Sequence, residues 1–144
     1  MSVTFEAEGV QFPKIKKTEL SKWINSVAEK YNKKAGEIAY LFCDDEKILV
    51  MNRDFLQHDF YTDIITFDYS EDDVIAGDIL ISLDTVKSNS ENYETTFEEE
   101  LHRVIIHGIL HLCGLNDSTP EEEKVMREAE NDALKKLPDF GVVL

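Results

Sequence analysis

Two histidines and one aspartate in the C-terminal half of the sequence have the spacing of a metal site. His107 and His111 are four positions apart, which places both imidazoles on one side of a helix, about 5–6 Å apart at Cβ. Both rings can then reach one zinc ion at about 2.0–2.1 Å. Gly114 is expected to end this helix, so that Asp117 can turn back as a third ligand. Three protein ligands and an open position predict a catalytic zinc ion in each chain.

The surroundings of the histidines allow two interpretations. Residues 104–112 are apolar apart from the histidines, so the helix is expected to be central and buried. An imidazole there is costly unless it is ligated or hydrogen-bonded. For an H-x-x-x-H pair alone, two hydrogen-bonded core histidines are the better interpretation, but the placement of Gly114 and Asp117 favours the metal. Cys113 is the one other nearby donor, and it is expected on the wrong side of the helix.

The residue after the first histidine bears on the reaction. The spacing is that of the metzincin pattern, but position 108 is glycine, where metalloproteases of the H-E-x-x-H type have the glutamate that acts as general base. The general base of the usual mechanism of peptide hydrolysis is therefore absent from this motif. Gly108 also leaves room for a larger ligand or for a close-packed strand near the metal.

Hydrophobic spacing and turn residues predict an α/β (α+β) fold in one domain over residues 1–144. About four strands should form a small mixed sheet packed around the central buried helix that carries the histidines. Strands are expected over residues 3–10, 37–43, 64–69 and 75–82, and helices over residues 18–31, 47–55, 84–92, 97–113 and 120–136. Thr18 is the expected N-cap of the first helix, and Asp44 and Asp45 of the second. The acidic runs in the first turns of the last two helices suit helix N-termini and require no other role.

Composition limits the compartment and the partners. The formal net charge is −15, and an acidic surface repels nucleic acid and anionic membranes at long range. The N-terminal segment lacks the features of a signal peptide, and the longest nearly apolar run, residues 104–115, is shorter than the roughly 20 residues that span a bilayer. Cys43 and Cys113 form no C-x-x-C pair and are expected to be buried and reduced. A soluble cytoplasmic protein without a membrane partner is predicted.

Short motifs along the chain match the pattern of one family. The matching positions are His107, Gly108, Leu110, His111, Leu112, Gly114, Thr62 to Phe67, Gly77 to Ile79, Asn52, Asp59, Met126 and Glu130. From about Leu49 to Glu130, the chain resembles the bacterial YbeY family of zinc-dependent endoribonucleases, whose signature is approximately H-G-x-L-H-L-x-G-Y-D-H. The resemblance implies a mixed sheet around a central helix and a role in ribosomal RNA processing and ribosome quality control.

Two positions depart from that family pattern. Asp117 stands where the family usually has histidine; aspartate still coordinates zinc, but its charge should weaken the Lewis acidity of the metal and can shift preference toward harder metals. Leu56 stands where the family often has an arginine for substrate, so Arg53 or His58 are the possible substitutes. Arg103, one turn before His107, is a further possible substrate contact. Its alternative role is a surface ion pair with a glutamate three or four positions earlier.

These observations predict a single-strand-directed metalloendoribonuclease that acts in ribosomal RNA maturation. Its zinc ion would polarise a phosphodiester oxygen or activate water, and no side chain is assigned as general base. The partner would be RNA, in particular ribosomal RNA or the ribosome, with no DNA. Two alternatives remain open. The first is a non-enzymatic ribosome-assembly protein with a structural metal, which is consistent with the net charge and with Leu56. The second is a small metallopeptidase, and Gly108 argues against it.

Overall fold

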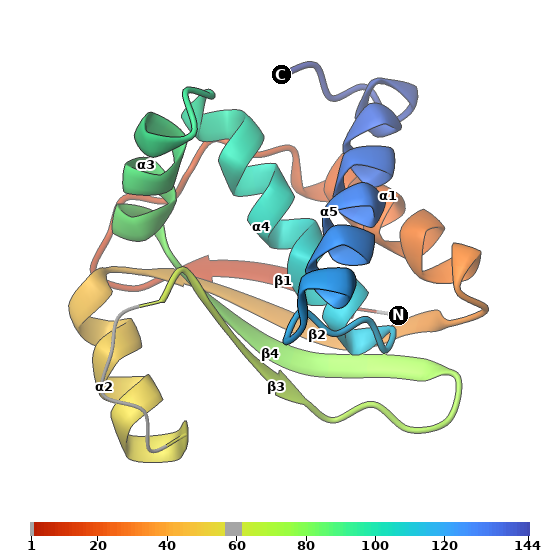
Figure 1. Cartoon of the computed structure of the whole chain (residues 1–144), viewed down its shortest axis with the longest axis horizontal. Coiled ribbons are helices and arrows are strands. Elements are labelled where there is room, and N and C mark those ends of the chain that lie inside the picture. Colours follow the sequence, from red (N-terminus) through yellow and green to blue (C-terminus); the bar gives the residue numbers. More distant parts are fainter. Residues whose placement is uncertain (1, 57–61) are drawn as a thin grey trace.

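A four-stranded mixed sheet is the framework of the computed structural model, which describes residues 2–56 and 62–144 (Figure 1). Its strands are β1 (Ser2–Ala7), β2 (Lys34–Cys43), β3 (Ile64–Asp68) and β4 (Val74–Ser82). The strand order is β1-β2-β4-β3. β1, β2 and β4 run parallel, whereas β3 is antiparallel to β4. The arrangement confirms the predicted small mixed sheet.

Helices pack on both faces of this sheet. They are α1 (Lys17–Lys30), α2 (Asp45–Leu56), α3 (Leu83–Asn92), α4 (Phe97–Leu112), α5 (Pro120–Lys135) and the short 3-10 helix η1 (Leu137–Phe140). Along β4, Ile79 and Ile81 belong to the main core with α1 and α4. Leu80, between them, packs with Ile48 of α2 on the opposite face, as the two-residue period of a strand requires. In Figure 1, α1, α4 and α5 lie over one face of the sheet, and α2 lies apart from them.

The predicted central helix is α4, and it is buried almost all round. Its buried apolar residues are Leu101, Val104, Ile105, Ile106, Ile109, Leu110 and Leu112. The hydroxyl of Thr96 caps the N-terminus by accepting a hydrogen bond from the Glu99 N–H at 3.1 Å. After Leu112 the chain turns at Gly114, whose φ of +106° lies in the left-handed region that favours glycine. The predicted end of the helix is confirmed.

The start of α1 differs from the prediction. The helix begins at Lys17 and its N-cap residue is Lys16, whose side chain makes no capping hydrogen bond. The Lys16 carbonyl accepts the first helical bond from the Leu20 N–H at 2.8 Å. Thr18 therefore lies inside the first turn, and its prediction as N-cap was wrong because the backbone becomes helical earlier than the polar residue that suggested a cap.

One of the two predicted caps of α2 is confirmed. The Asp44 carboxylate accepts a hydrogen bond from the Lys47 N–H at 2.9 Å. Asp45 is instead the first residue of the helix. Its carboxylate accepts hydrogen bonds from the hydroxyls of Ser82 and Thr85, both at 2.6 Å. Asp45 therefore joins α2 to the junction of β4 and α3 rather than capping its own helix.

The remaining compositional predictions concern the membrane and the thiols. Within residues 2–56 and 62–144, no helix is long and apolar enough to cross a bilayer. Both cysteines are free; Cys43 is buried as predicted, whereas Cys113 is only half-buried. Burial raises the pKa of Cys43 to about 12 and that of Cys113 to about 11, so both are neutral thiols at physiological pH.

Two buried hydrogen bonds join the helices to the rest of the core. The hydroxyl of Tyr40, in β2, donates to the Ile105 carbonyl of α4 at 2.8 Å, and the Tyr40 side chain is only 1% exposed. The indole N–H of Trp23, in α1, donates to the Ala133 carbonyl of α5 at 2.9 Å. These bonds connect residues far apart in sequence, so they help to set where α4 and α5 lie.

The substitution Tyr40→Phe is expected to lower the free energy of unfolding by about 1 kcal/mol, because it removes one buried hydrogen bond without opening a cavity. Urea denaturation followed by circular dichroism measures the change. Tyr69→Phe is the control, since Tyr69 is 60% exposed, and should alter stability by less than about 0.5 kcal/mol. Equal unfolding midpoints for Tyr40→Phe and the parent would contradict this role of the hydroxyl.

Candidate metal centre

The three predicted ligands line one cavity. It has a volume of about 400 Å³ and lies among the start of β3, α3, α4 and α5. Around it are Thr62, Asp63, Ile64, Thr66, Asn89, Tyr93, Glu100, Arg103, Val104, His107, His111, Asp117, Arg127 and Glu130. Most of these side chains are polar or charged, so the cavity suits a charged ligand rather than an apolar one.

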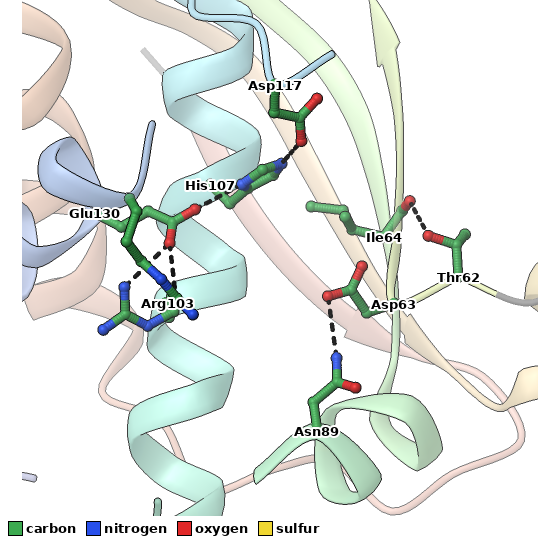
Figure 2. A network of polar contacts seen from close by, with 9 residues as sticks. Thr62, Asp63, Ile64, Asn89, Arg103, His107, Asp117 and Glu130 are labelled. Atoms are coloured by element: carbon green, nitrogen blue, oxygen red, sulfur yellow. Dashed lines mark hydrogen bonds and ion pairs between the residues drawn. The ribbon is translucent and has the colours of Figure 1, made fainter. Parts of the chain in front are cut away.

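The reversal of the chain after α4 brings Asp117 close to His107. His107 and His111 lie on successive turns of α4. Beyond Gly114, the Leu115 N–H donates a hydrogen bond back to α4 at 3.1 Å. Asp117 Oδ2 then lies 3.4 Å from His107 Nε2 (Figure 2). The structure therefore places all three predicted ligands at one site, two of them within ion-pair distance.

Glu130, on α5, holds the other ring nitrogen of His107. One carboxylate oxygen lies 2.7 Å from His107 Nδ1, and the other accepts a hydrogen bond from Arg103 at 3.1 Å (Figure 2). Glu130 is only 6% exposed. Burial acts to raise the pKa of Glu130, but the hydrogen bonds and charges of His107 and Arg103 outweigh it and lower that pKa. The carboxylate is thus ionised and accepts a hydrogen bond from His107 Nδ1.

The same contacts raise the basicity of the ring. Burial acts to lower the pKa of His107, but the hydrogen bond and charge of Glu130, followed by the charges of Asp117 and Asp63, raise it overall. A carboxylate that accepts from one ring nitrogen orients the other and makes it a better donor to a metal. With Nδ1 held by Glu130, the Nε2 atom of His107 is left facing Asp117.

The site fits zinc in its donor chemistry. Two imidazoles and a carboxylate are common zinc ligands, and the outer carboxylate on His107 is the usual partner of such a ligand. Within the described part of the chain, however, no three His, Cys, Asp or Glu side chains converge closely enough to hold an ion as they stand. His107 and Asp117 pair with each other instead. Zinc ligation by His107, His111 and Asp117 stays a prediction.

Gly108 faces the sheet and not the cavity. A Cβ atom at this position would lie 3.0 Å from Ile79 Cδ1 and 3.2 Å from Ile64 Cδ1. The absence of a side chain lets α4 pack closely on β3 and β4, which confirms the close-packed strand predicted from the sequence. A glutamate at this position would meet those isoleucines, so it could not act as a base in the present packing.

The three predicted substrate contacts have different outcomes. Arg103 lines the cavity, but its ion pair is with Glu130 and not with an earlier glutamate of its own helix. The alternative of an ion pair within its own helix was wrong, because α5 packs against α4 at this turn and places Glu130 beside Arg103. Arg53 lies on α2, on the other face of the sheet, and is not among the described residues around the cavity. His58 lies outside the described residues. Substrate contact by any of the three stays a prediction.

Several side chains of the cavity received no role from the sequence. Asp63 accepts a hydrogen bond from the Asn89 amide at 3.4 Å, and burial raises its pKa. Glu100 is only 4% exposed; burial, and then the charge of Asp63, raise its pKa. Asp63 and Glu130 did belong to the family resemblance, which was the available signal for them. The sequence contains no separate signal for Glu100, because it belongs to an acidic run that was assigned to the helix N-terminus.

The fold and the cavity define a small α/β protein with a pocket lined by histidines and carboxylates. The family model described as Endoribonuclease YbeY matches residues 4–138. A relative named Endoribonuclease YbeY from Bacteroides thetaiotaomicron is 60% identical over 134 residues, 93% of this chain and 98% of the relative. Another of that name, from Parabacteroides distasonis, is 59% identical over 139 residues, 96% of this chain and 98% of the relative. The chain therefore belongs to the YbeY family, as its motifs implied.

A solved structure shares the fold. The solution structure of TM1509 from Thermotoga maritima matches with a TM-score of 0.66 and 26% identity, covering 94% of this chain and 89% of that chain. The shared fold extends over nearly all of both chains. It supports the predicted mixed α/β architecture independently of the motif around the histidines.

The substitution Glu100→Gln is expected to raise the melting temperature at pH 7. Because the pKa of Glu100 is raised in the folded state, the folded protein holds the proton of the Glu100 carboxyl group more tightly than the unfolded chain does. This protonation therefore stabilises the fold fully below the ordinary glutamate pKa of about 4.3, and the stabilisation is lost as the pH rises through the folded-state pKa. The advantage of the glutamine variant should therefore vanish at low pH, as thermal melts at several pH values will show.

Glu98→Gln is the matched control, because Glu98 is exposed in the same turn of α4. It should not raise the melting temperature at pH 7, because it removes an exposed charge that suits the N-terminus of the helix. If Glu100→Gln melts at or below the temperature of the parent at pH 7, the Glu100 carboxylate is not an unfavourable buried charge.

Proposed function

We propose that this chain is a single-strand-directed, zinc-dependent endoribonuclease of the cytoplasm, acting in ribosomal RNA maturation and ribosome quality control as one domain over residues 1–144. The printed activity of its relatives supports RNA cleavage. One observation carries the site: the ring of His107 is held on one nitrogen by Glu130 at 2.7 Å, while the other nitrogen lies 3.4 Å from Asp117. That arrangement, in a cavity that also contains His111, suits a metal-dependent hydrolase.

Each residue of the site would have a separate task. His107 Nε2, His111 and Asp117 would hold the zinc ion. Zinc, when bound, would supply positive charge at the phosphoryl oxygens and lower the pKa of water at the cleavage site. Glu130 would keep the proton on His107 Nδ1 and fix the angle of the ring. Arg103, held by Glu130 beside His107, would add a positive charge to the wall that faces the substrate.

The two alternative functions have less support. A metallopeptidase of the H-E-x-x-H type needs a general base beside the metal, and the corresponding position, Gly108, is packed against the sheet. Cleavage of a phosphodiester mainly requires stabilisation of the negative charge on the phosphoryl oxygens, which a metal and an arginine supply. A purely structural metal would normally have four protein ligands, and the sequence supplies three at this site.

The acidic surface limits how RNA can bind. With a net charge of −15, long-range attraction of phosphates is absent, and binding would be confined to the cavity and its rim. Few phosphate contacts release few counterions, so the affinity should show a shallow dependence on salt.

Zinc content and cleavage of RNA test the proposal together. The purified protein should contain close to one equivalent of zinc and should cut single-stranded RNA in preference to duplex RNA, with casein left intact. His111→Ala and Asp117→Ala should lose bound zinc and RNA cleavage, because each removes a ligand. Elemental analysis and gel assays of the two RNAs and of casein measure both effects.

Asn116→Ala is the matched control, since Asn116 is exposed beside Asp117 and is not among the residues around the cavity. It should keep zinc and activity. Cleavage of casein that depends on His111, with RNA left intact, would overturn the nuclease in favour of a peptidase. Zinc retained without cleavage of either substrate would favour the non-enzymatic alternative.

A further inference from the structure

Tyr93 is an exposed aromatic ring at the mouth of the cavity. It follows the last residue of α3, where its N–H donates to the Asn89 carbonyl at 2.9 Å. The side chain is 60% exposed, yet it is one of the residues around the cavity that holds His107. A single exposed aromatic residue is ordinary on a protein surface, so its neighbours decide whether it is a binding element.

The guanidinium group of Arg127 lies over this ring. Its guanidinium carbon lies 5.9 Å from the centre of the Tyr93 ring, within the range of a cation–π contact. Arg127 belongs to α5, is 51% exposed, and lies 3.6 Å from a Glu130 oxygen. It is much more accessible than Arg103, which is 15% exposed. The pair therefore presents a flat ring and an accessible positive charge beside the predicted metal ligands.

Polar groups lie deeper in the cavity on the same side as α3. Asn89 is one helical turn before Tyr93, and its amide donates to Asp63 at 3.4 Å, a long bond that a ligand can exchange. Figure 2 shows Asn89 and Asp63 facing the cavity across from Glu130 and Arg103. An amide and a carboxylate provide the hydrogen-bond donors and acceptors that match the edge of a nucleobase.

We propose that Tyr93 and Arg127 form a subsite for one unpaired nucleobase of an RNA strand, with Asn89 and Asp63 at its polar edge. The proposal rests on the proposed endoribonuclease function and names the feature of the substrate that the cavity selects. A base in a duplex has both faces stacked and its pairing edge occupied, so it cannot lie on Tyr93. A base in a single strand can stack there while its phosphate meets Arg127.

This subsite would also explain how an acidic protein binds a negatively charged RNA strand. Stacking on an aromatic ring requires no net positive charge, and every base has a face that can take part. The cavity brings together the carboxylates of Asp63, Glu100, Asp117 and Glu130, which repel phosphates. An uncharged contact at the rim would therefore carry a large share of the affinity, and the sequence preference of the subsite would be mild.

The test measures binding with the full-length, zinc-loaded protein. The probe is a fluorescein-labelled single-stranded 2′-O-methyl oligoribonucleotide, followed by anisotropy and checked for intactness on a gel. Tyr93→Ala should weaken binding by about tenfold or more, whereas Tyr93→Phe, which keeps the ring, should stay within about twofold. Tyr69→Ala is the control, because Tyr69 is also 60% exposed but does not line this cavity; it should bind like the parent. A duplex of the same sequence should bind weakly and equally to the parent and to Tyr93→Ala.

The outcomes separate the subsite from the function. If the parent binds and cuts single-stranded RNA but Tyr93→Ala, with zinc and circular dichroism unchanged, binds equally well, the subsite is wrong and the function stands. If Tyr93→Phe loses as much affinity as Tyr93→Ala, the contact depends on the hydroxyl and stacking is overturned. If the parent neither binds nor cuts RNA, the proposed function fails, and the subsite fails with it.

Discussion

A buried carboxylate on α5 sets the geometry of the whole site. Glu130 is almost completely removed from solvent, and it is ionised because His107 and Arg103 both donate to it. Burying a charge is costly unless it is paired and hydrogen-bonded, and here both conditions are met. The contact joins α5 to α4, fixes the ring of His107, and leaves its second nitrogen toward Asp117. The docking of α5, supported by the bond from Trp23 to its backbone, is thus part of the chemistry.

Among the described residues, four carboxyl groups but only two arginines line the cavity around this contact. Burial raises the pKa values of Asp63 and Glu100, which means that these carboxylates are held in surroundings that disfavour their charge. A cation bound in the cavity would relieve that cost, and the same carboxylates would resist the approach of an RNA phosphate. The proposed metal on the histidine side and the proposed stacking contact at Tyr93 are both consistent with this electrostatic constraint.

Local sequence signals predicted much of this arrangement and missed the contacts between distant elements. The spacing of His107, His111, Gly114 and Asp117 placed three residues on one cavity because a helix and its terminal glycine are local structures. The partner of His107 lies 23 positions later, so no local pattern could assign it, although Glu130 belonged to the family resemblance. The burial of Glu100 could not be predicted for a related reason. It belongs to an acidic first turn, and only the packing of other helices around that turn buries it.

The zinc affinity of a Glu130→Gln variant would show whether this buried carboxylate controls the site. Glutamine keeps the shape of the side chain but loses the charge that holds the proton of His107, so zinc should bind about 10- to 100-fold more weakly than to the parent, as measured by competition with a chromophoric chelator. Glu128→Gln, on the exposed face of the same helix, should bind zinc like the parent. Equal zinc affinity for Glu130→Gln and the parent, with the fold retained, would contradict the account, because His107 would then need no orienting carboxylate.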